Sequence, residues 1–171
     1  MKITSVRTHV LEAALSHPFA YSRAWYDTRM AMLVEIETDD GLIGWGESYG
    51  PAWITSAAVR AIAPFLLGQD PLRTDFLWQE IYARLRDHGQ KGVVIEALSG
   101  IDIALWDIKG KRFGVPVSAL LGGPLRDHVQ ACATGLYRRK SDEDAADTPA
   151  TLRAYTADVA HFEAWPPQPD T

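Results

Sequence analysis

The sequence predicts an α+β fold in which a three-stranded antiparallel meander packs on a helical bundle. Apolar and polar residues alternate on both sides of the turn Asp39-Asp40-Gly41, which is the period of half-buried strands. After Gly50-Pro51 the apolar spacing changes to three or four residues, which is the period of an amphipathic helix. The length of 171 residues and the hydrophobic content of 47% are typical of a chain with an ordinary hydrophobic core.

The strands are predicted in the first part of the chain. An imperfect alternation over residues 3–11 indicates an opening strand, and residues 15–28 show no sustained period, so we expect them to lie outside regular structure. Residues 32–37 and 42–47 then form a hairpin around the turn at residues 39–41. Three antiparallel strands are enough for a stable sheet.

Three helices are predicted next. The first has an apolar stripe and ends near Gly68; the stripe consists of Ile54, Ala58, Ile62 and Phe65. The second has Asp70 or Thr74 near its N-cap, and its apolar residues are Phe76, Leu77, Ile81 and Leu85. The third runs from Gly92 to Phe113 and is expected to be a core helix, because a wide apolar stripe follows it; the stripe is formed by Val94, Ala97, Leu98, Ile101, Ala104, Leu105 and Ile108.

The C-terminal part of the chain predicts a different arrangement. After a short helical turn at residues 116–123, the run Val129–Thr134 indicates a strand buried on both faces. The charges of Arg138-Arg139-Lys140 are cancelled by the acids that follow, which favours a solvated loop. A helix is predicted over residues 148–161, and residues 165–171 are too rich in proline for a helix or a central strand.

Charge and composition limit the classes of partner. The net charge of −5 disfavours nucleic acid and anionic membrane surfaces as partners, and no apolar run is long enough to span a bilayer. The N-terminus lacks the apolar run of a secretory signal. Cys132 is the single cysteine, so we interpret it as a small buried apolar residue of a cytoplasmic protein.

No catalytic or metal-binding motif follows from the residues alone. The glycines Gly41, Gly44 and Gly46 lie on a hairpin rather than between a strand and a helix, so they are interpreted as structural. The histidines have no second histidine one helical turn away. A charged set on the predicted third helix is attributed to caps, helix pairing and solvation; it comprises Asp102, Asp107, Lys109 and Lys111.

One stretch of the third helix carries a specific family resemblance. Residues 97–111, which read ALSGIDIALWDIKGK, are followed by Phe113-Gly-Val-Pro116 and Leu120-Leu-Gly-Gly123. This pattern resembles the N-terminal capping domain of the mandelate racemase and muconate lactonising branch of the enolase superfamily. Within the branch, residues 85–92 and the strand end at 133–135 are most similar to galactarolactone cycloisomerases and related acid-sugar dehydratases.

The resemblance implies a function for complete relatives. A base removes the proton next to a carboxylate, and Mg²⁺ stabilises the enediolate, so that a sugar acid or lactone is dehydrated or isomerised. In the family, two cap loops shape the substrate pocket; in this chain their candidate substrate-binding residues are Tyr21, Arg23, Trp25, Tyr26, Tyr49 and Trp53. Arg23 is the preferred carboxylate contact because a guanidinium fork matches that group.

The resemblance also sets the expected domain organisation. We expect a capping domain over residues 1–123, followed over 124–171 by one βα unit of an incomplete (β/α)8 barrel with a divergent proline-rich tail. Because the base and metal ligands of the family lie on later barrel strands, we expect no catalytic residue, no bound Mg²⁺ and no turnover from this chain alone. We also expect a homo-oligomer or self-association. The alternative is a non-catalytic interaction module that associates with an intact homologue.

Overall fold

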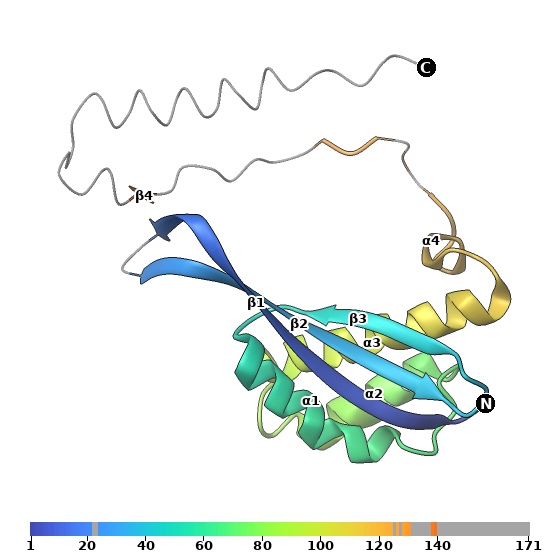
Figure 1. The fold of residues 1–171 in the computed structure, drawn as a ribbon. Coiled ribbons are helices and arrows are strands. Elements are labelled where there is room, and N and C mark those ends of the chain that lie inside the picture. Colours follow the sequence, from blue (N-terminus) through green and yellow to red (C-terminus); the bar gives the residue numbers. More distant parts are fainter. Residues whose placement is uncertain (22–23, 125, 127, 131–137, 140–171) are drawn as a thin grey trace. The chain divides into compact units, whose positions relative to one another are not determined.

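The computed structural model describes residues 1–21, 24–124, 126, 128–130 and 138–139 (Figure 1). The chain divides into two compact units, one formed by residues 1–13 and 30–125 and the other by residues 14–29 and 126–171. Several sequence predictions fall outside the described residues. They concern Arg23, Cys132, the strand at Val129–Thr134 beyond Gln130, the helix at 148–161 and the tail at 165–171. The predicted boundary at residue 123 remains a prediction.

The predicted meander is confirmed. The strands β1 (Ile3–Tyr21), β2 (Ala24–Thr38) and β3 (Ile43–Ser48) follow one another, and the sheet order is β3-β2-β1-β4. The β2–β3 hairpin pairs Met32 with Ser48 and Glu37 with Ile43. Its turn closes through the backbone N–H of Thr38, which donates to the carbonyl of Leu42 at 3.0 Å. Gly41 takes a positive φ of 83° there, as the turn requires.

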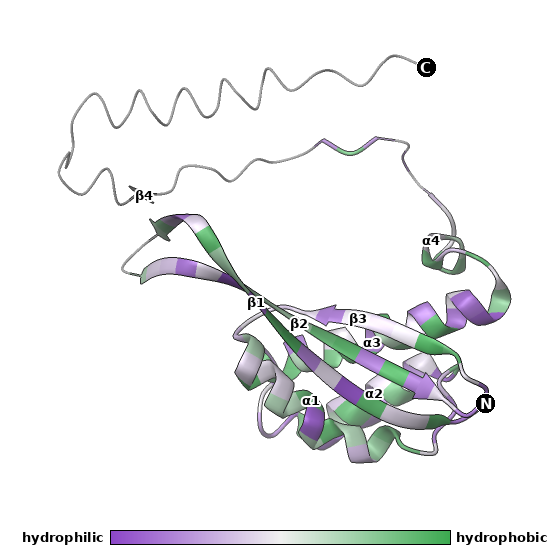
Figure 2. Ribbon diagram, in the orientation of Figure 1, coloured by the Kyte–Doolittle hydropathy of each residue, from purple (hydrophilic) through white to green (hydrophobic). Residues whose placement is uncertain are grey.

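The helices of the first unit cover one face of the sheet. They are α1 (Ala52–Leu66), α2 (Thr74–Leu85), α3 (Val93–Phe113) and the short α4 (Val117–Leu120). Apolar and polar bands alternate along β2 (Figure 2), and the apolar residues Met32, Val34 and Ile36 are completely buried. The core is continuous through the sheet and the three long helices, and its large members include Ile3, Met32, Ile36, Ile62, Leu66, Ile81, Leu98, Ile101, Leu105 and Ile108.

The predicted third helix and its stripe are confirmed, and α3 is the centre of this core. Ala97, Leu98, Ile101, Ala104, Leu105 and Ile108 are all buried. The helix ends where Gly114 adopts the left-handed conformation with φ 67°, and the N–H of Val115 donates to the carbonyl of Gly110 at 3.0 Å. This is the usual termination of a helix by a glycine.

The strand β3 packs on α3 by close backbone approach. A methyl group built on Gly44 would lie 2.6 Å from Cγ1 of Ile108, and one built on Gly46 would lie 2.8 Å from the backbone nitrogen of Ala104. Ser48 lies against Gly100 in the same way. Two strand residues advance by roughly 6.6 Å and four helix residues by roughly 6.0 Å, so alternate residues of β3 meet α3 once per turn. The glycines interpreted as structural therefore allow this contact.

The free edge of β3 is covered by side chains of α3. Asp107 accepts a hydrogen bond from the backbone N–H of Trp45 at 2.8 Å. Lys111 donates to the carbonyl of Ile43 at 2.7 Å and pairs with the same oxygen of Asp107 at 2.7 Å. Two outward backbone groups of an edge strand are thus satisfied by one i,i+4 pair.

The predicted face of α1 was wrong. Ile54 and Phe65 are 58% and 42% exposed, and only Ile62 of the predicted stripe is buried. The core face instead contains hydroxyl residues: Thr55 donates to the carbonyl of Pro51 at 3.1 Å, and the hydroxyls of Ser56 and Thr8 lie 2.9 Å apart. Because hydrogen bonds compensate their burial, hydropathy alone selects the wrong face.

Of the two residues predicted near the N-cap of α2, Thr74 lies next to it, but neither residue caps the helix. Arg73 occupies that position and makes no side-chain capping bond. The carboxylate of Asp70 accepts the N–H of Leu72 at 3.0 Å, so it stabilises the preceding turn. Thr74 is the first helical residue, and its hydroxyl accepts a hydrogen bond from Lys109 at 3.2 Å.

Residues 15–28 were wrongly predicted to lie outside regular structure. In the second unit, β1 continues to Tyr21 and β2 starts at Ala24. Phe19 and Tyr26 stack across the two strands at 5.6 Å between ring centroids. These cross-strand aromatic contacts stabilise a strand pair without a buried aliphatic row, so no period of two marks it in the sequence.

Two predictions for the C-terminal part differ from the structure. Arg138–Arg139, predicted as a loop, form the two-residue strand β4, which pairs antiparallel with Phe19 and Ala20. Val129, predicted to begin a buried strand, is 81% exposed, and the described residues 128–130 have no regular structure. Among the described strands none pairs with Val129, as burial in a sheet would require.

Candidate functional site

The turn Tyr49–Trp53, which links β3 to α1 and includes the first two residues of that helix, carries two of the predicted substrate-binding residues. Tyr49 is 84% exposed and Trp53 is 62% exposed. The turn backbone is held at its C-terminal end, because the carbonyl of Pro51 accepts the N–H groups of Ile54 and Thr55, each at 2.9 Å. The turn therefore presents two large amphipathic side chains to the outside from a fixed backbone.

The predicted residues Tyr21, Trp25 and Tyr26 lie on the hairpin of the second unit. Tyr21 ends β1, and Trp25 and Tyr26 belong to the first residues of β2. Tyr26 stacks on Phe19, and the guanidinium of Arg29 lies 4.9 Å from the centroid of the Phe19 ring. The order Arg29, Phe19, Tyr26 is a cationic and aromatic stack that sequence reasoning missed, since its members come from different strands. Arg23 is outside the described residues, and the turn and the hairpin belong to different units.

Glu96 is a residue near the turn that the sequence did not identify. It lies in the first turn of α3, where the helix dipole stabilises a negatively charged side chain, so a glutamate at this position is common. Its carboxyl group lies against Gly50: a methyl group on Gly50 would be 2.7 Å from the carboxyl carbon and 3.2 Å from Oε1. Oε2 is buried and has no hydrogen-bond partner among the described residues.

A charged network lies on the face of the sheet opposite the helices. Glu35 is buried, and its two oxygens are bound by Arg7 and by Nε2 of His9, the latter at 2.6 Å. The hydrogen bond from Arg7 is the main cause that lowers the pKa of Glu35, while burial acts in the opposite direction. Arg7 also binds Glu37 at 3.0 Å, and the ring of His9 packs on Trp45 at 5.3 Å. This network joins the three strands.

The charged residues of α3 have structural partners. Besides its bond to Thr74, Lys109 lies 4.6 Å from the centroid of Trp106, and Lys111 and Asp107 cover the edge of β3. Burial, and then the charge of Asp75, raise the pKa of Asp102, whereas a hydrogen bond with Trp106 lowers it. These contacts support the structural interpretation of the set.

The described residues do not fit a divalent metal site. Within residues 1–21, 24–124 and the few described beyond them, no three His, Cys, Asp or Glu side chains are close enough to hold an ion. A cation such as Mg²⁺ needs several oxygen ligands at once. We therefore derive no chemical step through a metal from this chain.

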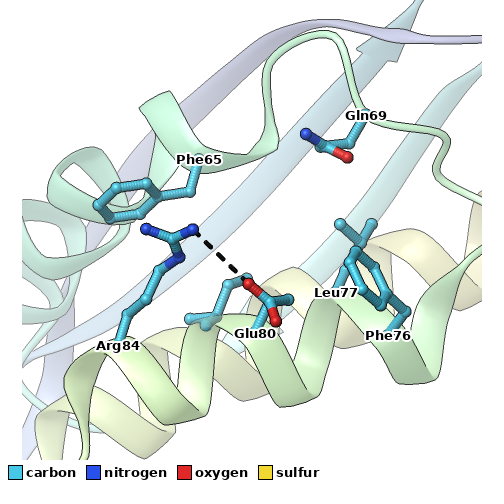
Figure 3. A pocket seen from close by; sticks show the side chains of 7 residues that line it. Phe65, Gln69, Phe76, Leu77, Glu80 and Arg84 are labelled. Atoms are coloured by element: carbon cyan, nitrogen blue, oxygen red, sulfur yellow. Dashed lines mark ion pairs between the residues drawn. The ribbon is translucent and has the colours of Figure 1, made fainter.

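A hollow between α1 and α2 is a less suitable candidate (Figure 3). It measures about 240 Å³ and is lined by Phe65, Gln69, Phe76, Leu77, Glu80, Ile81 and Arg84. The ion pair of Glu80 with Arg84, at 3.6 Å, lies at its rim, and the guanidinium of Arg84 lies 4.8 Å from the centroid of Phe65. Its volume is below the roughly 300–1,000 Å³ usual for ligand pockets, and no predicted site residue lines it. The turn at Tyr49–Trp53 remains the best candidate in the first unit.

Comparison with known proteins identifies the family. The family model described as "Mandelate racemase / muconate lactonizing enzyme, N-terminal domain" matches residues 3–122. The chain belongs to this family. The resemblance inferred from residues 97–123 is thereby confirmed, and the α+β architecture is that of the enolase-like N-terminal domain.

Two of the similar proteins carry the names of enzymes that act on a sugar acid or its lactone. D-galactarolactone cycloisomerase of Agrobacterium fabrum is 48% identical over 161 residues, which are 94% of this chain and 43% of that protein. D-galactonate dehydratase of Verminephrobacter eiseniae is 50% identical over 101 residues, 58% of this chain and 26% of that protein. The chain thus spans less than half the length of these relatives.

Solved structures agree with this assignment. The 3,6-anhydro-D-galactonate cycloisomerase of Zobellia galactanivorans has a TM-score of 0.70 at 41% identity, over 79% of this chain and 36% of that one. A member of the enolase superfamily from Agrobacterium tumefaciens has a TM-score of 0.65 at 27% identity, over 72% of this chain and 38% of that one. Among the described residues, no helix has both the length and the apolar character needed to cross a membrane.

Proposed function

We propose that this chain is the substrate-specificity cap of an acid-sugar cycloisomerase or dehydratase. In complete relatives, the resemblance implies proton removal next to a carboxylate with Mg²⁺ stabilising the enediolate. Among the described residues, no three His, Cys, Asp or Glu side chains lie close enough together to hold a metal ion. The part we assign to this chain is therefore contact with the substrate and exclusion of water from it.

The exposed aromatic turn is the observation that carries this proposal. Tyr49 and Trp53 are among the most exposed large side chains described, although each has a large apolar area. A single exposed aromatic residue needs no explanation, but two on one short, backbone-fixed turn are typical of a recognition surface. The chain belongs to this family and is 48% identical to a D-galactarolactone cycloisomerase. Both findings support a sugar acid or its lactone as the recognised molecule.

The proposed substrate is a sugar acid or its lactone. Tyr49 and Trp53 would pack on the C–H faces of the sugar and offer O–H and N–H groups to its hydroxyls. Tyr21, Trp25 and Tyr26 would act in the same way from the hairpin, and Arg23 would bind the carboxylate in a bidentate manner. A homo-oligomer and a cytoplasmic location, which the single cysteine favours, belong to the same proposal.

A hybrid enzyme tests the proposal. Residues 1–124 of this chain replace the matching segment of the A. fabrum cycloisomerase, and kcat/KM is measured on D-galactarolactone and a panel of aldarates. We expect an active hybrid in which Trp53→Ala and Arg23→Ala each lower kcat/KM by about tenfold or more, equivalent to about 1.4 kcal/mol of lost transition-state binding.

Phe76→Ala is the matched control, because Phe76 is an exposed aromatic residue on α2 rather than on the turn. Its kcat/KM should equal that of the parent hybrid. An unchanged kcat/KM for both Trp53→Ala and Arg23→Ala on every compound would remove these residues from the substrate site. A folded but inactive hybrid would contradict the proposed function itself.

A further inference from the structure

The close contact with α3 continues past the end of β3, where the residue on the helix is charged instead of small. Three successive steps join small residues: Gly44 meets Ala104, Gly46 meets Gly100, and Ser48 meets Gly100. Beyond the end of β3 and one helical turn earlier on α3, Gly50 meets the carboxyl group of Glu96. A charged side chain now occupies the helix position, where the preceding contacts had small residues.

Glu96 is half-buried, and one of its carboxylate oxygens is unusual. Oε2 of Glu96 is excluded from water and accepts no hydrogen bond from the described residues. Such an acceptor loses its hydration without compensation, which costs free energy. The dipole of α3 offsets part of this cost, but it does not explain why the group points at a turn rather than into water.

The partner of the carboxylate is the backbone of the turn. Gly50 has φ +97°, a conformation that L side chains rarely adopt, and the hydrogen in place of its side chain points at the Glu96 carboxyl group. A Cα–H group can act as a weak donor to a carboxylate. Glu96 therefore packs directly against Gly50. Gly50 lies next to Tyr49 and three residues before Trp53.

We infer that Glu96 is a positioning residue that fixes the Tyr49–Trp53 turn and so sets where its two aromatic side chains meet a substrate. The inference rests on the proposed function for the identity of that substrate, a sugar acid. The fixing of the turn itself rests only on the contact of Glu96 with Gly50, and it can be tested separately.

The test uses the full 171-residue chain and the variants Glu96→Ala and Glu96→Gln. Amide hydrogen exchange is measured for residues 49–53 and for the middle of α3, and the environment of Trp53 is followed by fluorine NMR of 5-fluorotryptophan-labelled protein, assigned with Trp53→Phe. Glu96→Ala should speed exchange in the turn by about tenfold or more and shift the Trp53 signal, with residues 100–108 unaffected. Glu96→Gln keeps the volume of the side chain and should restore both readouts to near the original values.

Glu47→Ala is the matched control, since Glu47 is an exposed glutamate of β3, the strand that leads into the turn. It should change neither readout. If Glu96→Ala leaves the turn unchanged, or if it speeds exchange along all of α3 and Glu96→Gln does the same, Glu96 acts only on the helix and the inference is wrong. Glu96→Gln keeps the test decisive if the alanine variant does not fold.

The hybrid enzyme separates this inference from the proposed function. With a positioning role, Glu96→Ala should raise KM several-fold with a smaller effect on kcat, and Glu96→Gln should restore KM. An inactive hybrid together with a mobilised turn would contradict the proposed function and leave the positioning role established. An active hybrid with an unmoved turn would contradict only the positioning role.

Discussion

Glu35 shows how strongly one side chain can depend on its neighbours. It lies on the sheet face opposite the helices, yet it is only 7% exposed because Arg7 and His9 bind its two oxygens. The sequence predicted the alternation of apolar and polar residues along β2. From that pattern alone, a glutamate at an outward position is expected to be solvated. Its partners come from β1, so no local pattern could identify the pair.

The stability of the protein should therefore fall in acid through Glu35. The Arg7 hydrogen bond lowers the pKa of this carboxyl, so the folded state holds its proton less tightly than the unfolded chain. The resulting stabilisation is present above the unfolded pKa of about 4.3 and is lost as the pH falls through the lower folded value. Urea unfolding from pH 7 to pH 3 should show that Glu35→Gln lowers the unfolding free energy by about 1–3 kcal/mol at pH 7 and flattens its acid dependence. Glu12→Gln, an exposed glutamate of β1, should do neither.

Asp102 should behave in the opposite way. Burial, followed by the charge of Asp75, raises the pKa of its carboxyl, and the Trp106 hydrogen bond only partly opposes this. The folded state then binds the proton more tightly than the unfolded chain, so stability is lost as the pH rises from the unfolded pKa through the folded one. Asp102→Asn should raise the unfolding free energy at pH 7 and have no such effect at pH 3. Equal effects of the substitution at the two pH values would show that the charge of Asp102 is not the cause.

At the scale of the elements, the sequence predicted the order of strands and helices and the whole of α3. The long apolar stripe of α3 identified its buried face because bulky aliphatic residues occupy that face. The face of α1 was missed, since Thr55 and Ser56 are buried with their hydroxyls hydrogen-bonded. The turn at Tyr49–Trp53 was expected to form part of the site from the family resemblance and its aromatic residues, and this stays a prediction. Glu96 and the Arg29 stack depend on contacts that only the folded chain brings together.

The close contact of β3 with α3 leaves no room for a side chain at Gly46. A methyl group there would lie 2.8 Å from the nitrogen of Ala104, and it would press on the rigid backbone of a core helix. We expect Gly46→Ala to lower the unfolding free energy by roughly 3 kcal/mol, because overpacked sites relax poorly. Gly89→Ala is the control, since a methyl group there would lie 3.3 Å from Cγ2 of Val94 and 3.5 Å from the carbonyl oxygen of Lys91, with no backbone atom closer. Comparable losses for the two variants in urea unfolding would contradict the backbone contact as the cause.

At the scale of the whole molecule, apolar side chains on the outside of the first unit remain to be explained. They lie on α3 and in the segment after it: Ile103, Phe113, Val115 and Leu121, which are all exposed. Exposed apolar patches often mark interfaces. Self-association, expected from the sequence, stays a prediction, and we expect these residues to take part in it.

The chain should therefore associate through this surface. Light scattering over a concentration series should give a mass above that of one chain, and Ile103→Asp with Phe113→Asp should return it to the mass of a monomer. The pair Leu67→Asp and Phe76→Asp is the control, because it places the same charges on the exposed surface of α1 and α2. A monomeric parent at every concentration would show that the exposed surface alone does not drive association.

The backbone packing of β3 on α3 also has a consequence for how new specificities can arise. The strand is held by glycine contacts and by Asp107 and Lys111, none of which uses the side chains of Tyr49 or Trp53. Both side chains are exposed, so these two positions can be diversified while the frame of the turn stays in place. A combinatorial library at Tyr49 and Trp53, with Gly50 and Glu96 unchanged, should consist mostly of folded members, so that recognition can evolve without loss of stability.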